Sequence, residues 1–162
     1  SFMAQFIKPK SLSVVVPVRN EEDNVADLIF EIRKSLKNKI NYEIIYVDDG
    51  STDDTLEKIK EISSRDSRVK YIELSRNFGH QNALKAGIDA SDAEIVIMMD
   101  CDLQHPPRLI NELLKQYELG YDIVRTHRVE NETAGYFKRK TSNQRRTTKD
   151  KWWENTGDYK QN

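Results

Sequence analysis

Short apolar runs alternate with amphipathic segments along most of the chain. Four runs rich in β-branched residues have the length and composition of buried strands; they cover residues 12–18, 42–47, 69–74 and 94–99. The segments between them carry apolar residues at helical spacing. Helices are predicted over 25–38, over 83–89 and from 106 to Gly120, and another helix is predicted to follow a cap at Thr52 or Asp53. A further strand is predicted to begin at 122–124. The alternation predicts an α/β fold with a mostly parallel sheet and helices on both faces.

Acidic side chains follow two of these predicted strands directly. Asp48 and Asp49 come at the end of the second, and Asp100 and Asp102 follow the fourth. Ligands of parallel sheets bind beyond the carboxyl ends of the strands, and carboxylates that lie close together repel one another unless a cation neutralises them. A few hard oxygen ligands, with Gln104 as a further acceptor, suit Mg²⁺ or Mn²⁺ that also binds phosphate. The pattern therefore predicts a metal–pyrophosphate site, and the alternative is a pair of solvated turn aspartates.

Length and composition narrow the classes of protein that the sequence allows. The 162 residues suffice for one domain with a hydrophobic core. No run of 18 apolar residues is present, so no membrane-spanning helix is predicted. The first residues lack the hydrophobic stretch of a signal peptide, which makes the cytoplasm the expected location. The single cysteine, Cys101, excludes an intrachain disulfide, and without a paired base it is not expected to be a nucleophile.

Charge is divided unevenly along the chain. Residues 1–137 carry 18 basic and 24 acidic side chains, whereas residues 138–162 carry 8 and 3. This division predicts an acidic, cation-binding domain over 1–137 and a basic tail over 138–162, which either meets an anionic partner or is a solvated segment. Residues 138–151 contain no aliphatic side chain and are predicted to be loop or disordered. No nucleic-acid partner is expected.

Four motifs follow one another along the chain: LSVVVPVRNEEDNV, YEIIYVDDGSTDDT, LSRNFGHQNALKAGI and IVIMMDCDLQHPP. Together they resemble the successive motifs of family 2 inverting glycosyltransferases, which have the Rossmann-like GT-A fold. The run DCDLQHPP is similar to the branch that transfers sugars to polyprenyl phosphates, which includes dolichyl-phosphate mannose synthases and undecaprenyl-phosphate sugar transferases. The resemblance covers roughly residues 10–130.

The resemblance implies a role for individual residues. Asp49 would accept the N3–H of the nucleotide base, and Asp48 would shape the turn beside it. Arg128 would meet phosphate groups. The metal would be held by Asp100, Asp102 and Gln104. The other positions that match nucleotide- and sugar-binding residues of the family are Pro17, Asn20, Glu22, Arg76, Asn77, Gly79 and Gln81.

The mechanism implied by the resemblance is a single in-line displacement at the sugar C1, with inversion. A divalent metal and basic side chains would stabilise the charge on the leaving nucleoside diphosphate. UDP is the expected nucleotide, with GDP as the second choice. A polyprenyl-phosphate acceptor is already anionic and needs no general base, and it would place the protein at the inner face of the membrane with peripheral contact. A glycan hydroxyl would need a base, for which Asp158 in Thr156-Gly157-Asp158 is the candidate.

Other classes of protein fit the motifs less well. A sugar nucleotidyltransferase would need a Gly-rich phosphate loop after the first strand, where PVRNEED stands instead. A dehalogenase-type phosphatase carries its Asp-x-Asp after the first strand, not the fourth. A non-catalytic nucleotide-sugar-binding module also remains open as an alternative. In the family the motif around Asp158 is followed by further core, whereas four residues follow Asp158 in this sequence. The chain is therefore expected to hold the nucleotide-binding half and only part of the acceptor region.

Overall fold

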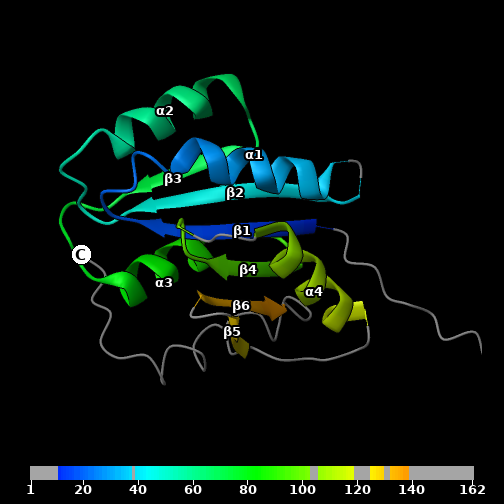
Figure 1. Cartoon of the computed structure of the whole chain (residues 1–162). Helices are drawn as coiled ribbons and strands as arrows, with labels where there is room; N and C mark the ends of the chain where they lie inside the picture. The colour runs from blue at the N-terminus through cyan, green and yellow to red at the C-terminus, as the bar shows by residue number, and fades with distance from the viewer. Residues whose placement is uncertain (1–10, 38, 103–105, 119–124, 130–131, 139–162) are drawn as a thin grey trace, which may run out of the picture.

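The computed structural model describes residues 11–37, 39–102, 106–118, 125–129 and 132–138. Within this part of the chain, six strands form one sheet in the order β3-β2-β1-β4-β6-β5 (Figure 1). The strands are β1 Ser11–Val18, β2 Asn41–Asp48, β3 Val69–Glu73, β4 Ile95–Met99, β5 Arg125–Val129 and β6 Glu132–Lys138. The helices are α1 Val25–Leu36, α2 Thr55–Arg65, α3 His80–Ala90 and α4 Pro106–Glu118. The predicted α/β fold with a mostly parallel sheet is confirmed.

The first four strands pair in parallel, and each of them is followed by a helix. β1 lies at the centre, between β2 and β4, and its residues from Leu12 to Val18 are almost fully buried. This double coverage explains why β1 is a continuous apolar run rather than an alternating one. All four carboxyl ends therefore lie at one edge of the sheet.

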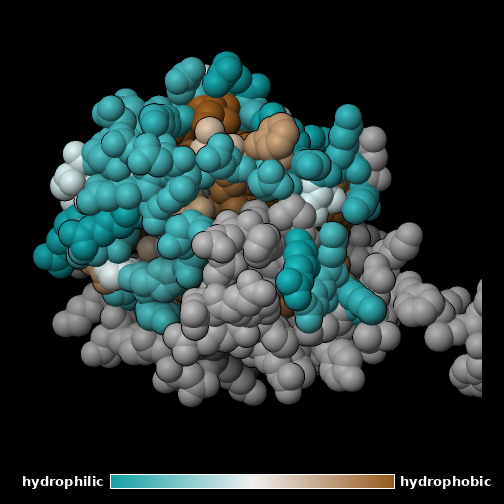
Figure 2. Space-filling view, in the orientation of Figure 1, coloured by the Kyte–Doolittle hydropathy of each residue, from teal (hydrophilic) through white to brown (hydrophobic). Residues whose placement is uncertain are grey.

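The helices cover both faces of the sheet, as predicted. One face packs against α1, α2 and α4 through a core that includes Val14, Val16, Tyr46, Ile59 and Leu113. The opposite face packs against α3 through a smaller core that includes Val15, Val47, Leu84, Ile88 and Met98. The surface of the described residues is largely hydrophilic on the face seen in Figure 2. Among the described helices, none has both the length and the apolar character that crossing a bilayer requires.

Two strands differ from what the sequence pattern predicted. The strand expected to begin at 122–124 is described only from Arg125, and residues 122–124 lie outside the described residues. β6 was not predicted, and it inserts antiparallel between β4 and β5. Its sequence ETAGYFK contains a glycine and two terminal charges, so it lacks the apolar run that identifies the other strands. The predicted loop or disorder of residues 138–151 lies almost entirely outside the described residues.

Helix α3 approaches β1 so closely that only glycine fits at Gly87. A Cβ atom at this position would lie 2.2 Å from Val15 Cγ1 and 3.1 Å from Val47 Cγ2. We expect Gly87→Ala to lower the free energy of unfolding by about 1–3 kcal/mol, measured by urea denaturation, because overpacking displaces the helix from the sheet. The same substitution in a Val15→Ala background should cost less, since the obstructing methyl group is gone. Equal costs in the two backgrounds would contradict this packing argument.

Candidate functional site

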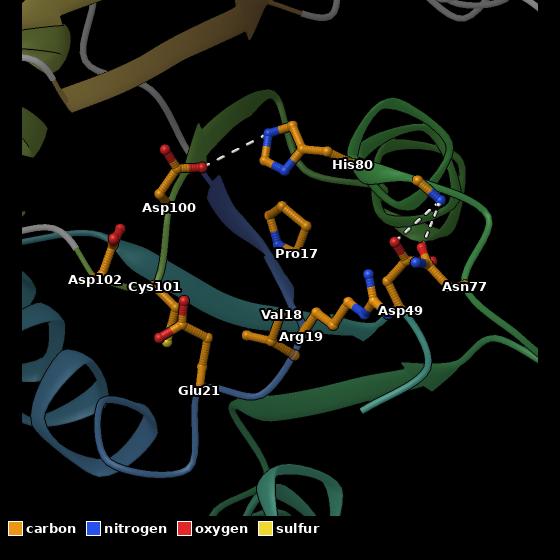
Figure 3. Close-up of a pocket in the computed structure, with 11 residues that line it drawn as sticks. Pro17, Val18, Arg19, Glu21, Asp49, Asn77, His80, Asp100, Cys101 and Asp102 are labelled. Carbon is orange, nitrogen blue, oxygen red and sulfur yellow. Dashed lines mark hydrogen bonds and ion pairs between the residues drawn. The ribbon is translucent and has the colours of Figure 1, made fainter. Parts of the chain in front are cut away.

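A pocket of about 440 Å³ opens at the edge where the parallel strands end. Its walls come from the ends of β1 and β4, from the residue after β2, and from the segment between β3 and α3 (Figure 3). The lining residues are Pro17, Val18, Arg19, Glu21, Asp49, Asn77, Gly79, His80, Asp100, Cys101 and Asp102. The position agrees with the rule that ligands of parallel sheets bind beyond the strand carboxyl ends.

Asp49 fixes the loop that forms one wall of this pocket. The residue is only 5% exposed. Oδ1 accepts the backbone N–H of Phe78 at 2.7 Å, and Oδ2 accepts the backbone N–H of Gly79 at 3.0 Å. Each carboxylate oxygen keeps a second lone pair for another donor. Asp49 can therefore hold the loop and still accept a hydrogen bond from a ligand in the pocket.

The turn after Asp49 packs directly against the same loop. Gly50 has a φ of +80°, a conformation that favours glycine. A Cβ atom at Gly50 would lie 2.8 Å from the backbone nitrogen of Asn77. Asn77 in turn accepts the N–H of Gly79 through its side-chain oxygen at 3.1 Å. The loop after β3 is thus held against the end of β2 by both backbone packing and hydrogen bonds.

Asn20 and Glu22 join the loop after β1 to the loop after β2, and neither lines the pocket. Asn20 has a φ of 54°, and its Oδ1 accepts the backbone N–H of Thr52 at 2.8 Å. Glu22 Oε2 accepts the N–H of Asp54 at 3.1 Å. Both residues were predicted to border the nucleotide, and the contacts of the structure show them supporting the loop that begins with Asp49.

Asp100 and Asp102 stand at the other side of the pocket from Asp49 (Figure 3). They follow β4 on a turn, with the Asp102 side chain exposed and the Asp100 side chain 34% exposed. Among the described residues, no group of three or more histidine, cysteine, aspartate or glutamate residues could hold a metal by itself. Two carboxylates facing a polar pocket fit a Mg²⁺ or Mn²⁺ ion that takes its remaining ligands from water and phosphate. The residues present thus match the predicted metal–pyrophosphate site.

Cys101 lies between the two aspartates and is buried. Burial raises the pKa of its thiol far above the ordinary value, and the carboxylates of Glu21, Asp102 and Asp100 raise this pKa further. A thiol in this environment stays protonated and is a poor nucleophile. The electrostatics agree with the expectation that Cys101 is not a nucleophile.

The remaining predicted residues are placed as follows. Pro17 lines the pocket, whereas Asp48 is buried and its Oδ1 lacks a hydrogen-bond partner among the described groups. Arg76 lies over the Phe78 ring at 4.7 Å and is exposed. Gln81 is exposed on the first turn of α3, outside the lining, and Arg128 lies in β5. Gln104 and Asp158 lie outside the described residues.

Five lining residues were not among the predicted site residues: Val18, Arg19, Glu21, His80 and Cys101. Arg19 and Glu21 directly follow β1, so the strand-end rule applied to β1 would have found them. His80 was interpreted as a loop residue, but α3 begins at His80 rather than near 83. Gly79, with a φ of +96°, precedes the helix, and a glycine directly before a helix is the signal that marks this boundary.

Fold and site together define a class of protein: an α/β domain whose parallel strands end at a pocket with one loop-bound carboxylate and a pair of carboxylates suited to a cation. The chain belongs to glycosyl transferase family 2, whose family model matches residues 13–161. The predicted family is therefore confirmed.

Known relatives and solved structures agree with this assignment. The chain is 46% identical over 119 residues to the putative glycosyltransferase CsbB of Bacillus subtilis, covering 73% of this chain and 36% of CsbB. It is 39% identical over 142 residues to undecaprenyl-phosphate 4-deoxy-4-formamido-L-arabinose transferase of Proteus mirabilis, covering 86% of this chain and 43% of that protein. Among solved structures, it is similar to glucosyl-3-phosphoglycerate synthase of Mycobacterium tuberculosis, solved with Mn²⁺, UDP and glucosyl-3-phosphoglycerate. The TM-score is 0.56 and the identity 30%, over 70% of this chain and 42% of the synthase.

The chain thus spans less than half the length of these relatives. The likeness to the synthase confirms the expected GT-A fold for the described strands and helices.

Proposed function

We propose that this chain binds a nucleotide sugar together with Mg²⁺ or Mn²⁺ and takes part in transferring the sugar to a polyprenyl phosphate. The observation that carries the proposal is the pocket with Asp49 on one side and Asp100 and Asp102 on the other. This arrangement suits a ligand with a hydrogen-bonding base at one end and a diphosphate at the other. UDP is the favoured nucleotide, supported by the similar synthase that was solved with UDP and Mn²⁺.

The described residues would perform distinct tasks in this reaction. Asp49 is held in place by two backbone N–H groups and can accept the base N3–H with its free lone pairs. The loops after β1 and β2, joined through Asn20 and Glu22, keep this wall rigid. Asp100 and Asp102 would hold the divalent ion. When bound, that ion neutralises charge on the leaving diphosphate.

The polyprenyl-phosphate acceptor is supported by the relative that is named an undecaprenyl-phosphate transferase. A phosphate acceptor is anionic at neutral pH, so the inverting displacement at C1 needs no protein base to remove a proton. In this proposal the acceptor lies at the inner face of a membrane, Arg128 in β5 meets phosphate groups, and Asp158 belongs to the acceptor side. A hydroxyl acceptor would instead make the reaction depend on Asp158.

Thermal denaturation with a panel of nucleotides tests the donor site. We expect UDP at about 100 times its Kd to stabilise the protein by roughly 2.7 kcal/mol when Mn²⁺ is present, which raises Tm by roughly 5–10 °C for a chain of this size. GDP should give a smaller shift, and CDP and ADP serve as matched controls. If no nucleotide raises Tm with Mn²⁺, the donor-site proposal is wrong.

Product analysis tests the acceptor separately. The chain is incubated with UDP-sugars, Mn²⁺ and undecaprenyl phosphate; lipid-linked sugar is detected by mass spectrometry, and its anomeric configuration is determined by NMR. Formation of a glycosyl phosphate with inverted anomeric configuration supports the whole proposal. Metal-dependent UDP binding without transfer would restrict this chain to the donor-binding part of the reaction.

A further inference from the structure

Arg19 directly follows β1, and it lines the pocket together with Asp49 (Figure 3). The two residues are neighbours at the ends of adjacent parallel strands, because Val18 pairs with Asp48 in the register of β1 and β2. The backbone N–H of Asp49 also donates to the carbonyl oxygen of Val18 at 2.8 Å. Figure 3 shows the Arg19 side chain extending toward Asp49. The pocket therefore has a basic side chain beside the carboxylate that is proposed to bind the base.

The backbone that carries Arg19 is fixed to the turn after β2. The next residue, Asn20, donates its N–H to Ser51 Oγ at 3.0 Å and accepts the N–H of Thr52 through its side chain at 2.8 Å. Arg19 itself is exposed, and among the residues that the structure describes its guanidinium has no hydrogen-bond or ion-pair partner. Its N–H donors are therefore available to a ligand that lies against Asp49.

A donor beside an acceptor matches one part of a uracil ring. Uracil carries its N3–H next to the carbonyl oxygen O4, and arginine supplies donors only. Guanine presents the same pair as N1–H and O6. Cytosine and adenine have an amino group in place of this carbonyl and no hydrogen on the ring nitrogen beside it. At the same ring position they turn a lone pair toward the carboxylate and a donor toward the guanidinium, and polar groups that face each other unmatched are costly.

We propose that Arg19 selects the base of the nucleotide, because its guanidinium donates to O4 of the uracil whose N3–H is accepted by Asp49. This inference deepens the proposed function and rests on it. It assigns Arg19 to the base and leaves the diphosphate to the side of the pocket that carries Asp100 and Asp102. Hydrogen bonds from an ionised donor are stronger than those between neutral groups. The pair of Arg19 and Asp49 therefore favours UDP, accepts the base edge of GDP, and disfavours CDP and ADP.

Calorimetry with the full chain in EDTA tests the contact with the base. We expect Arg19→Ala to weaken UDP binding by about tenfold or more and to reduce the preference for UDP over CDP by at least the same factor. The analogue 4-thio-UDP replaces O4 by a weaker acceptor, so it should bind the wild type less tightly relative to UDP than it binds Arg19→Ala. Comparing the two proteins cancels the effect of sulfur on N3–H itself. The analogue 2-thio-UDP, altered at the other carbonyl, should show no such difference.

Two controls separate this contact from other roles of a basic side chain. Inorganic pyrophosphate with Mn²⁺ should bind the wild type and Arg19→Ala equally. Lys34→Ala, which removes a positive charge from an exposed position on α1, should bind UDP like the wild type. The Tm of Arg19→Ala without ligand should also match the wild type, because substitutions at exposed side chains change stability little.

The outcomes distinguish the inference from the function on which it rests. Unchanged UDP affinity in Arg19→Ala would overturn the role of Arg19 alone. An equal loss of UDP and pyrophosphate affinity would also overturn it, because Arg19 would then contact the diphosphate. The same is true if the preference for UDP over CDP stays as in the wild type, or if the two proteins differ toward 2-thio-UDP rather than 4-thio-UDP. A wild type that binds no UDP would overturn both the inference and the donor site.

Discussion

Replacing Asp102 by asparagine is expected to abolish the contribution of Mn²⁺ to UDP binding. The substitution keeps the size of the side chain but removes one of the two carboxylates that face the cation side of the pocket. Loss of a hydrogen-bond partner behind a metal ligand already costs 10–100-fold in metal affinity. Loss of the ligand charge itself should therefore weaken Mn²⁺ binding by about 100-fold or more, measured by calorimetry at fixed UDP concentration.

The exposed position of Asp102 makes this experiment clean. A substitution at an exposed side chain changes stability little, so the Tm of Asp102→Asn without ligand should match that of the wild type. UDP affinity in EDTA should also stay unchanged, because the base side of the pocket is not altered. Lys34→Gln, an exposed substitution on α1 on a different part of the surface, is the control for nonspecific effects of charge. Undiminished Mn²⁺ binding in Asp102→Asn would remove the metal site from the proposal.

The part of the site that sequence alone predicted follows from one property of parallel sheets. Because β1, β2 and β4 run in the same direction, their carboxyl ends meet, and residues far apart in sequence converge there. Asp49, Asp100 and Asp102 were identified in this way from apolar runs that end in carboxylates. These runs were easy to recognise because both faces of the sheet are covered, which makes the central strands apolar throughout.

The features that sequence alone did not predict depend on contacts between distant segments. The contacts by which Asn20 joins two loops were not predicted: its side chain accepts backbone N–H groups from the loop after β2. Nothing in the order of residues shows whether a polar side chain will bind a ligand or a neighbouring loop. His80 was missed because the first turn of α3 has no apolar periodicity. Strand β6 was missed because its pairing with β4 depends on long-range contacts rather than on its own composition.

Removal of the Asp49 carboxylate should cost more stability than any other single change in the pocket. Asp49 is nearly fully buried and accepts two backbone N–H groups from the loop after β3. Hydrogen bonds to a charged group contribute about 1.5–3 kcal/mol each, so Asp49→Ala should lower the free energy of unfolding by roughly 3–5 kcal/mol. Urea denaturation measures this loss. UDP affinity should fall as well. Asn77, Gly79 and His80 line the pocket, and they belong to the segment that loses its attachment when the Asp49 carboxylate is removed.

The neighbouring residue, Asp48, provides the matched control because its carboxylate is equally buried but lacks the same support. Its Oδ1 has no hydrogen-bond partner among the described groups, whereas both oxygens of Asp49 have one. A buried polar oxygen without a hydrogen-bond partner is unfavourable, so Asp48→Asn should leave stability unchanged or raise it slightly. Asp49→Asn should destabilise, because one acceptor becomes an amide that faces a backbone N–H. Equal losses for the two asparagine variants would show that burial, and not the two N–H bonds, determines the cost. Opposite effects would establish that Asp49 holds the loop after β3 in place.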